Sequence, residues 1–304
     1  MKFEVDKELF PFENHFLTTS NGSEVHYVDE GQGPVILMMH GNPAWSFLYR
    51  KMITKLKGHF RCIAPDYPGF GLSTAPDGFD FLAGSQTEVM IEFVEKLALK
   101  DFFIVMQDWG GPIGLAIAEK IPERVQGMII GNSWAWPLKD KPRFRVFSWL
   151  MGGPIGRVMA QSFNGVWRFF MKEGFVDPRS DKEMAMYAAP FRDRKNRKQT
   201  SIFPRQLVKA YEFEEQVEAG LDKLTEKPVL FLWGKEDFAF QEPELERFKS
   251  YFPDHVHHSL EASHFWQDEQ GEVASDFLLD WAPDVLRNAG QVSDQLPPKA
   301  DIQE

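Results

Sequence analysis

Short apolar runs and longer amphipathic stretches alternate along most of the chain. Stretches with helical spacing of apolar residues follow several of the runs, and the clearest of them spans 85–99. Short continuous apolar runs are typical of strands that are buried on both faces, and their alternation with helices predicts a mainly parallel sheet flanked by helices. The candidate strands lie at 34–39, 60–65, 102–106, 125–131, 227–233 and 255–260.

The amino-terminal part adds a different signal. Residues 16–29 alternate in polarity around Asn21-Gly22, which favours a two-residue hairpin turn between antiparallel strands. Together with the six runs, this hairpin predicts an eight-stranded, mostly parallel sheet of an α/β fold.

Between 133 and 220 the strand–helix alternation stops, and a segment rich in Trp, Phe, Met and Arg shows mostly helical spacing. We therefore predict a main domain formed by 1–132 and 221–288, interrupted by a helical cap at 133–220. The polar residues 289–304 are expected to be disordered.

Composition narrows the function classes. The 304 residues carry a net charge of −11 and present no extended basic face, so a nucleic-acid partner is not expected. The single cysteine, Cys62, excludes an internal disulfide and any cysteine-based metal site. The amino terminus does not resemble a signal peptide, and no apolar run is long enough to cross a membrane. We therefore expect a cytoplasmic protein of bacterial type with no membrane partner.

The stretch 102–115 carries the most informative residue. An apolar strand is followed by Gly110 and Gly111, and a helical pattern begins at Pro112, so Asp108 lies on a sharp strand-to-helix turn. Asp is ionised at pH 7 and can attack a saturated carbon directly, forming an alkyl ester. The alternative is that Asp108 only caps the following helix.

Polar motifs follow four of the predicted strands. They comprise 40–43, Asp108 with its neighbour Trp109, Asp237 and His264. The carboxyl ends of parallel strands meet at one edge of a sheet, so these side chains are expected to converge there. In chain order Asp108, Asp237 and His264 follow the sequence nucleophile, acid, base, with Glu236 as a rival for the acid.

Asn42 and Trp109 each follow a residue at a strand end. Their backbone N–H groups can form an oxyanion hole for ester hydrolysis. Their side chains are also N–H donors, which suits an anion that departs from the attacked carbon, such as a halide. Turn formation at Asn42 and core packing of Trp109 are the alternatives.

The chain resembles the haloalkane dehalogenases of the α/β-hydrolase superfamily over about residues 15–285. The similar motifs are His40–Arg50, Asp66–Ser73, Gln107–Gly111 and Ser263–Phe265, with Tyr187–Phe191 and Phe203-Pro204 in the cap.

The resemblance implies a two-step reaction without cofactor or metal. Asp108 would displace halide from a small apolar haloalkane, and His264, supported by Asp237, would activate water to hydrolyse the alkyl-enzyme ester to a primary or secondary alcohol. Asn42 and Trp109 would bind the halide. The protein would be a monomer or a weak homo-oligomer.

The family divides by the position of its acid and by the partner of its Trp donor. This chain has Asn132 where some members carry Glu, so its acid must be Asp237, and its Asn42 makes a cap Trp donor optional. The pattern resembles the third branch of the family and leaves open a minor role for Trp136 or Trp167.

Other functions share this fold. An epoxide hydrolase would need two cap tyrosines as acids, for which Tyr187 and Tyr211 are the candidates. A luciferase of the same lineage is also conceivable, because fold does not determine function. A non-catalytic ligand-binding protein would be expected to lack Asp108, Asp237 or His264, and all three are present.

Overall fold

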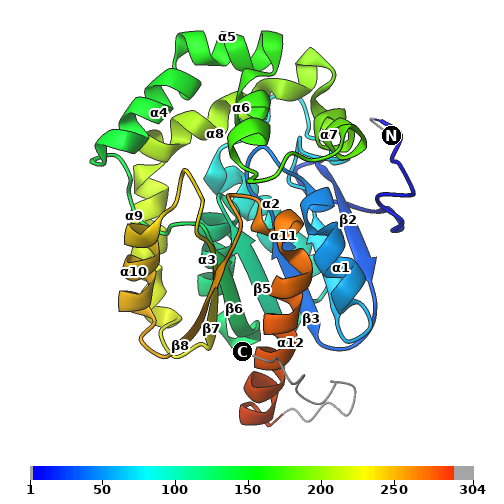
Figure 1. Ribbon diagram of the computed structural model, residues 1–304, viewed down its shortest axis with the longest axis vertical. Helices are drawn as coiled ribbons and strands as arrows, with labels where there is room; N and C mark the ends of the chain where they lie inside the picture. Colours follow the sequence, from blue (N-terminus) through cyan, green and yellow to red (C-terminus); the bar gives the residue numbers. More distant parts are fainter. Residues whose placement is uncertain (1–2, 291–304) are drawn as a thin grey trace.

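The computed structural model describes residues 3–290, and its centre is a single eight-stranded sheet with helices on both faces (Figure 1). The strand order is β1-β2-β4-β3-β5-β6-β7-β8. The strands are β1 (His15–Thr18), β2 (Glu24–Glu30), β3 (Val35–Met39), β4 (Arg61–Pro65), β5 (Phe102–Gln107), β6 (Val125–Gly131), β7 (Val229–Gly234) and β8 (His255–Leu260).

The pairing confirms the predicted α/β-hydrolase architecture. Strands β1 and β2 form the expected hairpin, with Gly22 at φ +87° in its turn, and β2 pairs antiparallel with β4. The other neighbours, from β4 through β3 to β8, are parallel. The predicted disordered tail lies outside the described residues, apart from its first two positions.

Both faces of the sheet are buried, as the continuous apolar runs predict. On β5, Phe102, Ile104 and Met106 point into one core, and Phe103 and Val105 point into the other. Helices α2, α3 and α10 cover the first core, and α1 and α12 cover the second. These helices are α1 (Arg50–Leu56), α2 (Ala83–Lys96), α3 (Gly110–Lys120), α10 (Glu242–Tyr251) and α12 (Gly271–Asn288).

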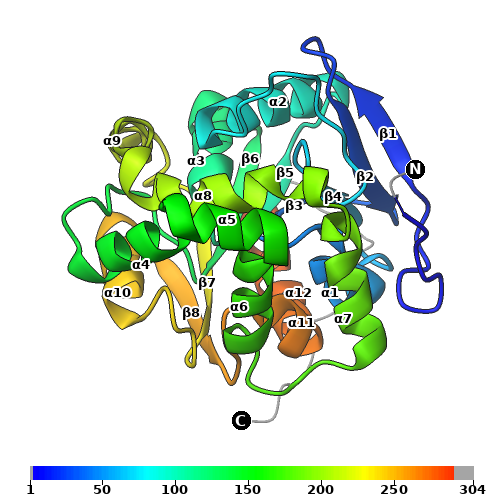
Figure 2. The ribbon, with the colours of Figure 1, turned by 90° about the horizontal axis from the view of Figure 1, so that it is seen from above.

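The segment between β6 and β7 is helical and lies over the carboxyl ends of the parallel strands, at the top of Figure 1 and nearest the viewer in Figure 2. The domain limits proposed for this cap stay a prediction. Its helices are α4 (Pro142–Gly152), α5 (Pro154–Phe163), α6 (Gly165–Glu173), α7 (Asp181–Ala188), α8 (Lys198–Lys209) and α9 (Tyr211–Gly220).

Short helical segments complete the fold. Helix α11 (Trp266–Glu269) precedes α12, and 3-10 turns occur at Ser46–Tyr49, Pro122–Arg124, Ala189–Phe191, Arg194–Arg197 and Leu221–Lys223. Within residues 3–290, no helix is both long enough and apolar enough to span a bilayer.

Candidate active site

Asp108 occupies the tight turn between β5 and α3, with φ at +50°. Few non-glycine residues adopt this left-handed conformation, and the surrounding contacts must hold it. The Asp108 N–H donates to the Asn132 carbonyl at 3.0 Å, and the Ser133 hydroxyl donates to the Asp108 carbonyl at 2.7 Å. A Cβ at Gly41 would lie 2.3 Å from Asp108 Oδ1, so only glycine permits this close approach.

The Asp108 carboxylate is buried and receives backbone N–H donors. The Asn42 N–H donates to Oδ1 at 2.7 Å, and the Trp109 N–H also bonds to this carboxylate. Burial raises the pKa of Asp108 to about 6, although His264 and the two N–H groups act in the opposite direction. The carboxylate is therefore mostly ionised at pH 7, and the backbone N–H groups of Asn42 and Trp109 are bonded to it.

His264 lies between the two acids. Its Nε2 is 3.7 Å from Asp108 Oδ2, and its Nδ1 is 3.0 Å from Asp237 Oδ2. Asp237 and His264 are buried, whereas Glu236 is exposed, so the structure brings Asp237 and not Glu236 to the histidine. Burial disfavours the charged imidazole, but the charge and hydrogen bond of Asp237, with Asp108, outweigh burial and raise the pKa of His264.

Gln107 also contacts the histidine, and our sequence analysis gave it no role. Its Nε2 lies 3.0 Å from His264 Nε2 and 3.0 Å from the His264 carbonyl oxygen. Its side chain is fully buried, and its Oε1 has no hydrogen-bond partner among the described residues. The signal available in the sequence was an amide at the end of an otherwise apolar strand.

Asn132 is a second residue that the sequence analysis did not assign to the site. Its Nδ2 donates to the carbonyls of Gly234 and Phe240 at 3.0 and 3.1 Å, and its Oδ1 accepts from the Gly234 N–H at 2.7 Å. Because its carbonyl also accepts from Asp108, Asn132 joins the nucleophile turn to the loop that carries Asp237.

The side chains of the two predicted halide donors are buried. Trp109 packs edge-on against Trp134 at a centroid distance of 4.7 Å and against Phe203 at 5.1 Å. Asn42 is 3% exposed, and its Oδ1 has no hydrogen-bond partner in the described part of the chain.

A cavity of about 150 Å³ opens onto Asp108. Phenyl rings dominate its wall, and rings also surround His264, so the carboxylate and the imidazole lie in a water-poor environment. The cavity is lined by Phe144, Phe147, Phe170, Phe238 and Phe240, with Leu207, Ala239 and Arg143.

The tryptophans and tyrosines that the sequence offered as further site residues do not line the Asp108 cavity. The Trp167 indole donates to the Tyr187 carbonyl at 3.1 Å, and Trp136 packs on Phe248 at a centroid distance of 4.8 Å. The Tyr187 hydroxyl donates to Asp268 at 2.6 Å, and the Tyr211 hydroxyl donates to Glu212 at 3.2 Å. The two tyrosines therefore contact neither Asp108 nor its cavity, which disfavours the epoxide hydrolase alternative.

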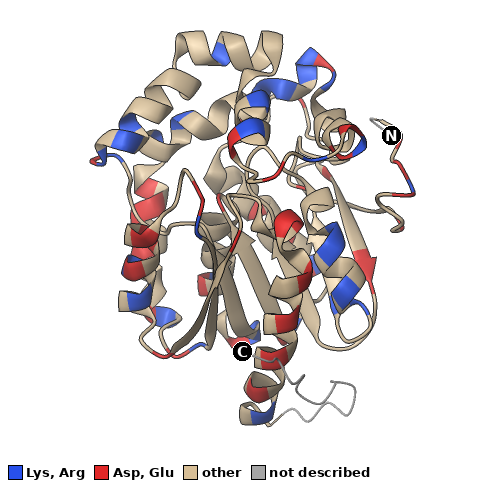
Figure 3. Ribbon diagram, in the orientation of Figure 1, with Lys and Arg blue, Asp and Glu red and all other residues tan. Residues whose placement is uncertain are grey.

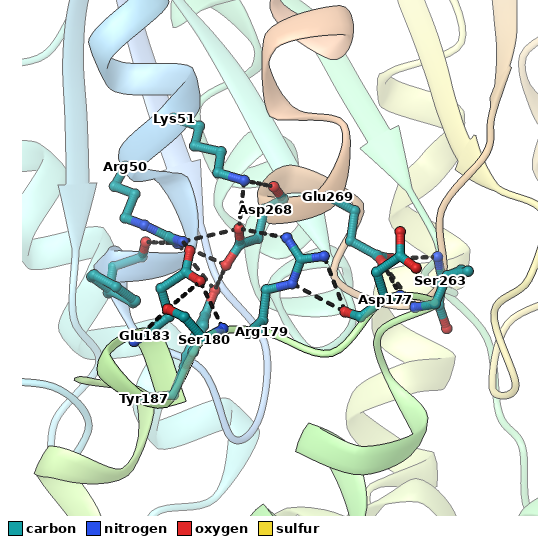
Figure 4. A network of polar contacts seen from close by, with 12 residues as sticks. Arg50, Lys51, Asp177, Arg179, Ser180, Glu183, Tyr187, Ser263, Asp268 and Glu269 are labelled. Atoms are coloured by element: carbon teal, nitrogen blue, oxygen red, sulfur yellow. Dashed lines mark hydrogen bonds and ion pairs between the residues drawn. The ribbon is translucent and has the colours of Figure 1, made fainter. Parts of the chain in front are cut away.

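A network of ion pairs links the cap to the main domain close to the loop that carries His264 (Figure 4). Arg50 on α1 pairs with Asp268 at 2.7 Å and with Glu183 of the cap at 2.5 Å. The neighbouring Glu269 accepts from the Ser263 N–H at 2.7 Å, immediately before His264. Among residues 3–290, no cluster of His, Cys, Asp and Glu is arranged to hold a metal ion.

Known proteins share this architecture and much of the sequence. The alpha/beta hydrolase fold family matches residues 34–270. Haloalkane dehalogenase 2 of Mycobacterium tuberculosis is 38% identical over 270 residues, which cover 88% of this chain and 94% of that protein. The cis-3-alkyl-4-alkyloxetan-2-one decarboxylase of Shewanella oneidensis is 31% identical over 307 residues, which cover 97% and 95% of the two chains.

A solved structure of a haloalkane dehalogenase has the same fold as this chain. A single-substitution variant of the haloalkane dehalogenase DatA from Agrobacterium tumefaciens superposes with a TM-score of 0.81 at 25% identity, covering 91% of this chain and 99% of that one. The chain therefore belongs to the α/β-hydrolase family, and within it to the haloalkane dehalogenases, hydrolases that act on carbon–halogen bonds.

Proposed function

We propose that the protein hydrolyses haloalkanes through a covalent alkyl ester on Asp108, as a third-branch dehalogenase with an Asp108–His264–Asp237 triad. The supporting observation is the ionisable Asp108 carboxylate at the end of a phenyl-lined cavity, 3.7 Å from the imidazole of His264. A cavity of about 150 Å³ suits a substrate of a few carbons.

In the first step, Asp108 Oδ2 attacks the halogen-bearing carbon and the halide departs with the bonding electrons. Oδ1 is already engaged by the Asn42 N–H, which leaves Oδ2 as the attacking atom. The Asn42 amide and the Trp109 indole are the proposed halide donors. They assist catalysis because halide charge is greater in the transition state than in the bound substrate.

In the second step, His264 removes a proton from water, and the hydroxide attacks the ester carbonyl of Asp108. The backbone N–H groups of Asn42 and Trp109 stabilise the oxyanion that forms on this carbonyl. Asp237 stabilises the imidazolium. The products are an alcohol, a halide ion and a proton, and the enzyme is regenerated.

Two variants test the covalent step. With 1,2-dibromoethane or 1-iodobutane, Asp108→Ala should release no halide, whereas His264→Phe should release one halide per enzyme and then stop. Mass spectrometry of His264→Phe should show the alkyl adduct on the peptide that contains Asp108. Halide release by Asp108→Ala, or turnover of His264→Phe without an adduct, would disprove these roles.

A second candidate substrate is a 3,4-dialkyl oxetan-2-one, because the Shewanella decarboxylase matches 97% of this chain at 31% identity. Such a lactone contains a strained bond from a saturated carbon to oxygen, which a carboxylate nucleophile can open. A cis-dialkyl oxetan-2-one should be assayed beside the haloalkanes for loss of CO₂. A higher kcat/KM for the lactone would make decarboxylation the main function.

A further inference from the structure

The outer surface of the cap is apolar, although it faces away from the protein core. On α4 the exposed residues include Val146, Trp149 and Leu150, with Trp149 71% exposed. On α5 they include Ile155 at 77% exposure. We call this surface the cap face, and its residues are Val146, Trp149, Leu150, Ile155, Val158, Met159 and Phe163.

On both helices the residues of the cap face lie opposite a stripe of buried residues. Phe144, Ser148 and Gly152 form the buried stripe of α4, and Gly156 and Ala160 form the buried stripe of α5. Both helices pack on α8, and Figure 1 shows them on the side of α8 away from the sheet. The exposed residues opposite the buried stripes therefore face away from the sheet. A monomeric soluble protein rarely exposes a contiguous apolar patch of this kind, and such patches mark interaction sites.

The charge of this region is opposite to that of the whole protein. Residues 141–172 contain no Asp or Glu, although the chain carries −11 overall. Figure 3 shows blue but no red on α4 and α5. The basic residues of this segment are Lys141, Arg143, Arg145, Arg157, Arg168 and Lys172.

A groove beside the cap face adds a place for anionic groups. Its volume is about 970 Å³, and Trp149 lies on its wall. Arg145, Arg157, Arg205 and Lys209 also line it, and all four are exposed. Asp140 is the one acidic residue among the described residues that line it, so the groove is basic on balance. Aromatic and aliphatic side chains next to Lys and Arg are the arrangement that suits the boundary between lipid headgroups and acyl chains.

We propose that the cap face docks on a membrane surface that contains anionic lipids, with the apolar stripes in the acyl boundary and the arginines against the headgroup phosphates. The cytoplasmic leaflet carries such lipids. A second copy of this chain fits the surface less well, because pairing two cap faces would bring two clusters of like charge together.

Docking would place the active-site cavity close to the lipid. Helix α4 carries the exposed Trp149 on its outer side and the cavity-lining Phe144 on its inner side. An apolar substrate dissolved in the membrane would therefore be concentrated near the cavity. Membrane binding itself does not depend on the proposed reaction, so the two proposals can fail separately.

This proposal revises the sequence-based expectation of no membrane partner. That expectation rested on the lack of a spanning segment and on the acidic net charge. A surface contact requires neither a spanning segment nor a basic chain, only a local face that is apolar and basic.

The test is co-sedimentation of the full chain with vesicles of phosphatidylcholine, with and without phosphatidylglycerol. Ile155→Glu should lower the partition coefficient on anionic vesicles about tenfold or more, since it places a charge in the acyl boundary. The double variant Arg145→Glu/Arg157→Glu should lower it by at least as much, since each basic residue near the surface contributes about fivefold.

The matched control is Val273→Glu, an exposed apolar residue on α12 that is 43% accessible and outside the cap face. It should bind vesicles like the unaltered protein, and circular dichroism should show that every variant is folded. Failure of the unaltered protein to bind anionic vesicles, or equal binding by Ile155→Glu, would overturn the proposal. Sedimentation equilibrium showing a dimer that Ile155→Glu dissociates would assign the face to self-association instead.

Discussion

The Gln107 amide nitrogen contacts two atoms of His264, Nε2 and the carbonyl oxygen, each at 3.0 Å. A carbonyl oxygen can only accept, so the amide must present its N–H₂ group on this side. In the neutral imidazole the same group donates to an unprotonated Nε2. The ring proton is then on Nδ1, where Asp237 accepts it at 3.0 Å. Gln107 thus favours the tautomer that a general base requires.

The first prediction concerns Gln107→Glu. A carboxylate at this place would accept a proton from Nε2 and stabilise the imidazolium, so the pKa of His264 should rise further. Because the base must be neutral, ester hydrolysis is lost as pH falls through this pKa, and the acidic limb of the single-turnover hydrolysis rate should move up by about one pH unit. Gln107→Leu is the control that adds no charge, and an unchanged limb in Gln107→Glu would contradict the assigned role.

A second prediction tests whether Asp237 or the adjacent Glu236 is the acid that supports His264. Asp237→Asn should slow hydrolysis of the ester by about a hundredfold or more, because an amide can present the wrong group to Nδ1 and cannot stabilise the imidazolium. Alkylation should be affected much less. Glu236→Gln removes the exposed neighbour and should leave both steps unchanged. Burst-phase halide release distinguishes the two steps, and a larger effect of Glu236→Gln would reverse the assignment.

A third prediction concerns the halide donors. Asn42→Ala keeps the backbone N–H that bonds to Asp108 and removes only the amide, and Trp109→Leu removes the indole donor. Each should weaken bromide binding about tenfold, measured by calorimetry, since a hydrogen bond to a charged group contributes about 1.5–3 kcal/mol. Trp167→Phe is the matched control, because its indole donates to the Tyr187 carbonyl. Unchanged bromide affinity in both test variants would exclude these side chains as donors.

A fourth prediction concerns stability. Glu214 is buried in the cap and accepts from the Trp134 indole at 3.0 Å, and burial raises its pKa from 4.5 to about 8. The folded state therefore holds this proton more tightly than the unfolded state, so the stability contribution is greatest at low pH and falls as pH rises from about 4.5 to about 8.

Glu214→Gln removes this dependence. It should be more stable than the unaltered protein at pH 7, by up to about 3 kcal/mol, and equally stable at pH 4. Urea unfolding at the two pH values measures the difference. A variant that is less stable at pH 7 would show that Glu214 is ionised in the folded protein.

The main features of the fold could be predicted from sequence because they depend on local pattern. Apolar runs such as 102–106 become strands when both sheet faces are covered, and Gly22 marks its hairpin by turn chemistry. The predicted convergence of Asp108, Asp237 and His264 follows from the same pattern, since parallel strands end at one edge of the sheet.

The contacts of amide side chains could not be predicted in this way. Gln107 and Asn132 act through hydrogen bonds to residues 157 and 102 positions away, and no local periodicity encodes such partners. The orientation of the cap face could not be predicted either. The spacing of Val146, Trp149 and Leu150 indicates one helix face but not whether that face meets the core or the solvent.

The placement of the catalytic groups has a consequence for how the protein loses activity. The catalytic groups follow four different strands, β3, β5, β7 and β8, so their mutual distances depend on the pairing of those strands. Turnover therefore reports the integrity of the sheet from β3 to β8. Loss of catalysis during denaturation should coincide with loss of β-structure there, and a chain that has shed the edge strand β8 retains a nucleophile but has no base to release its own product.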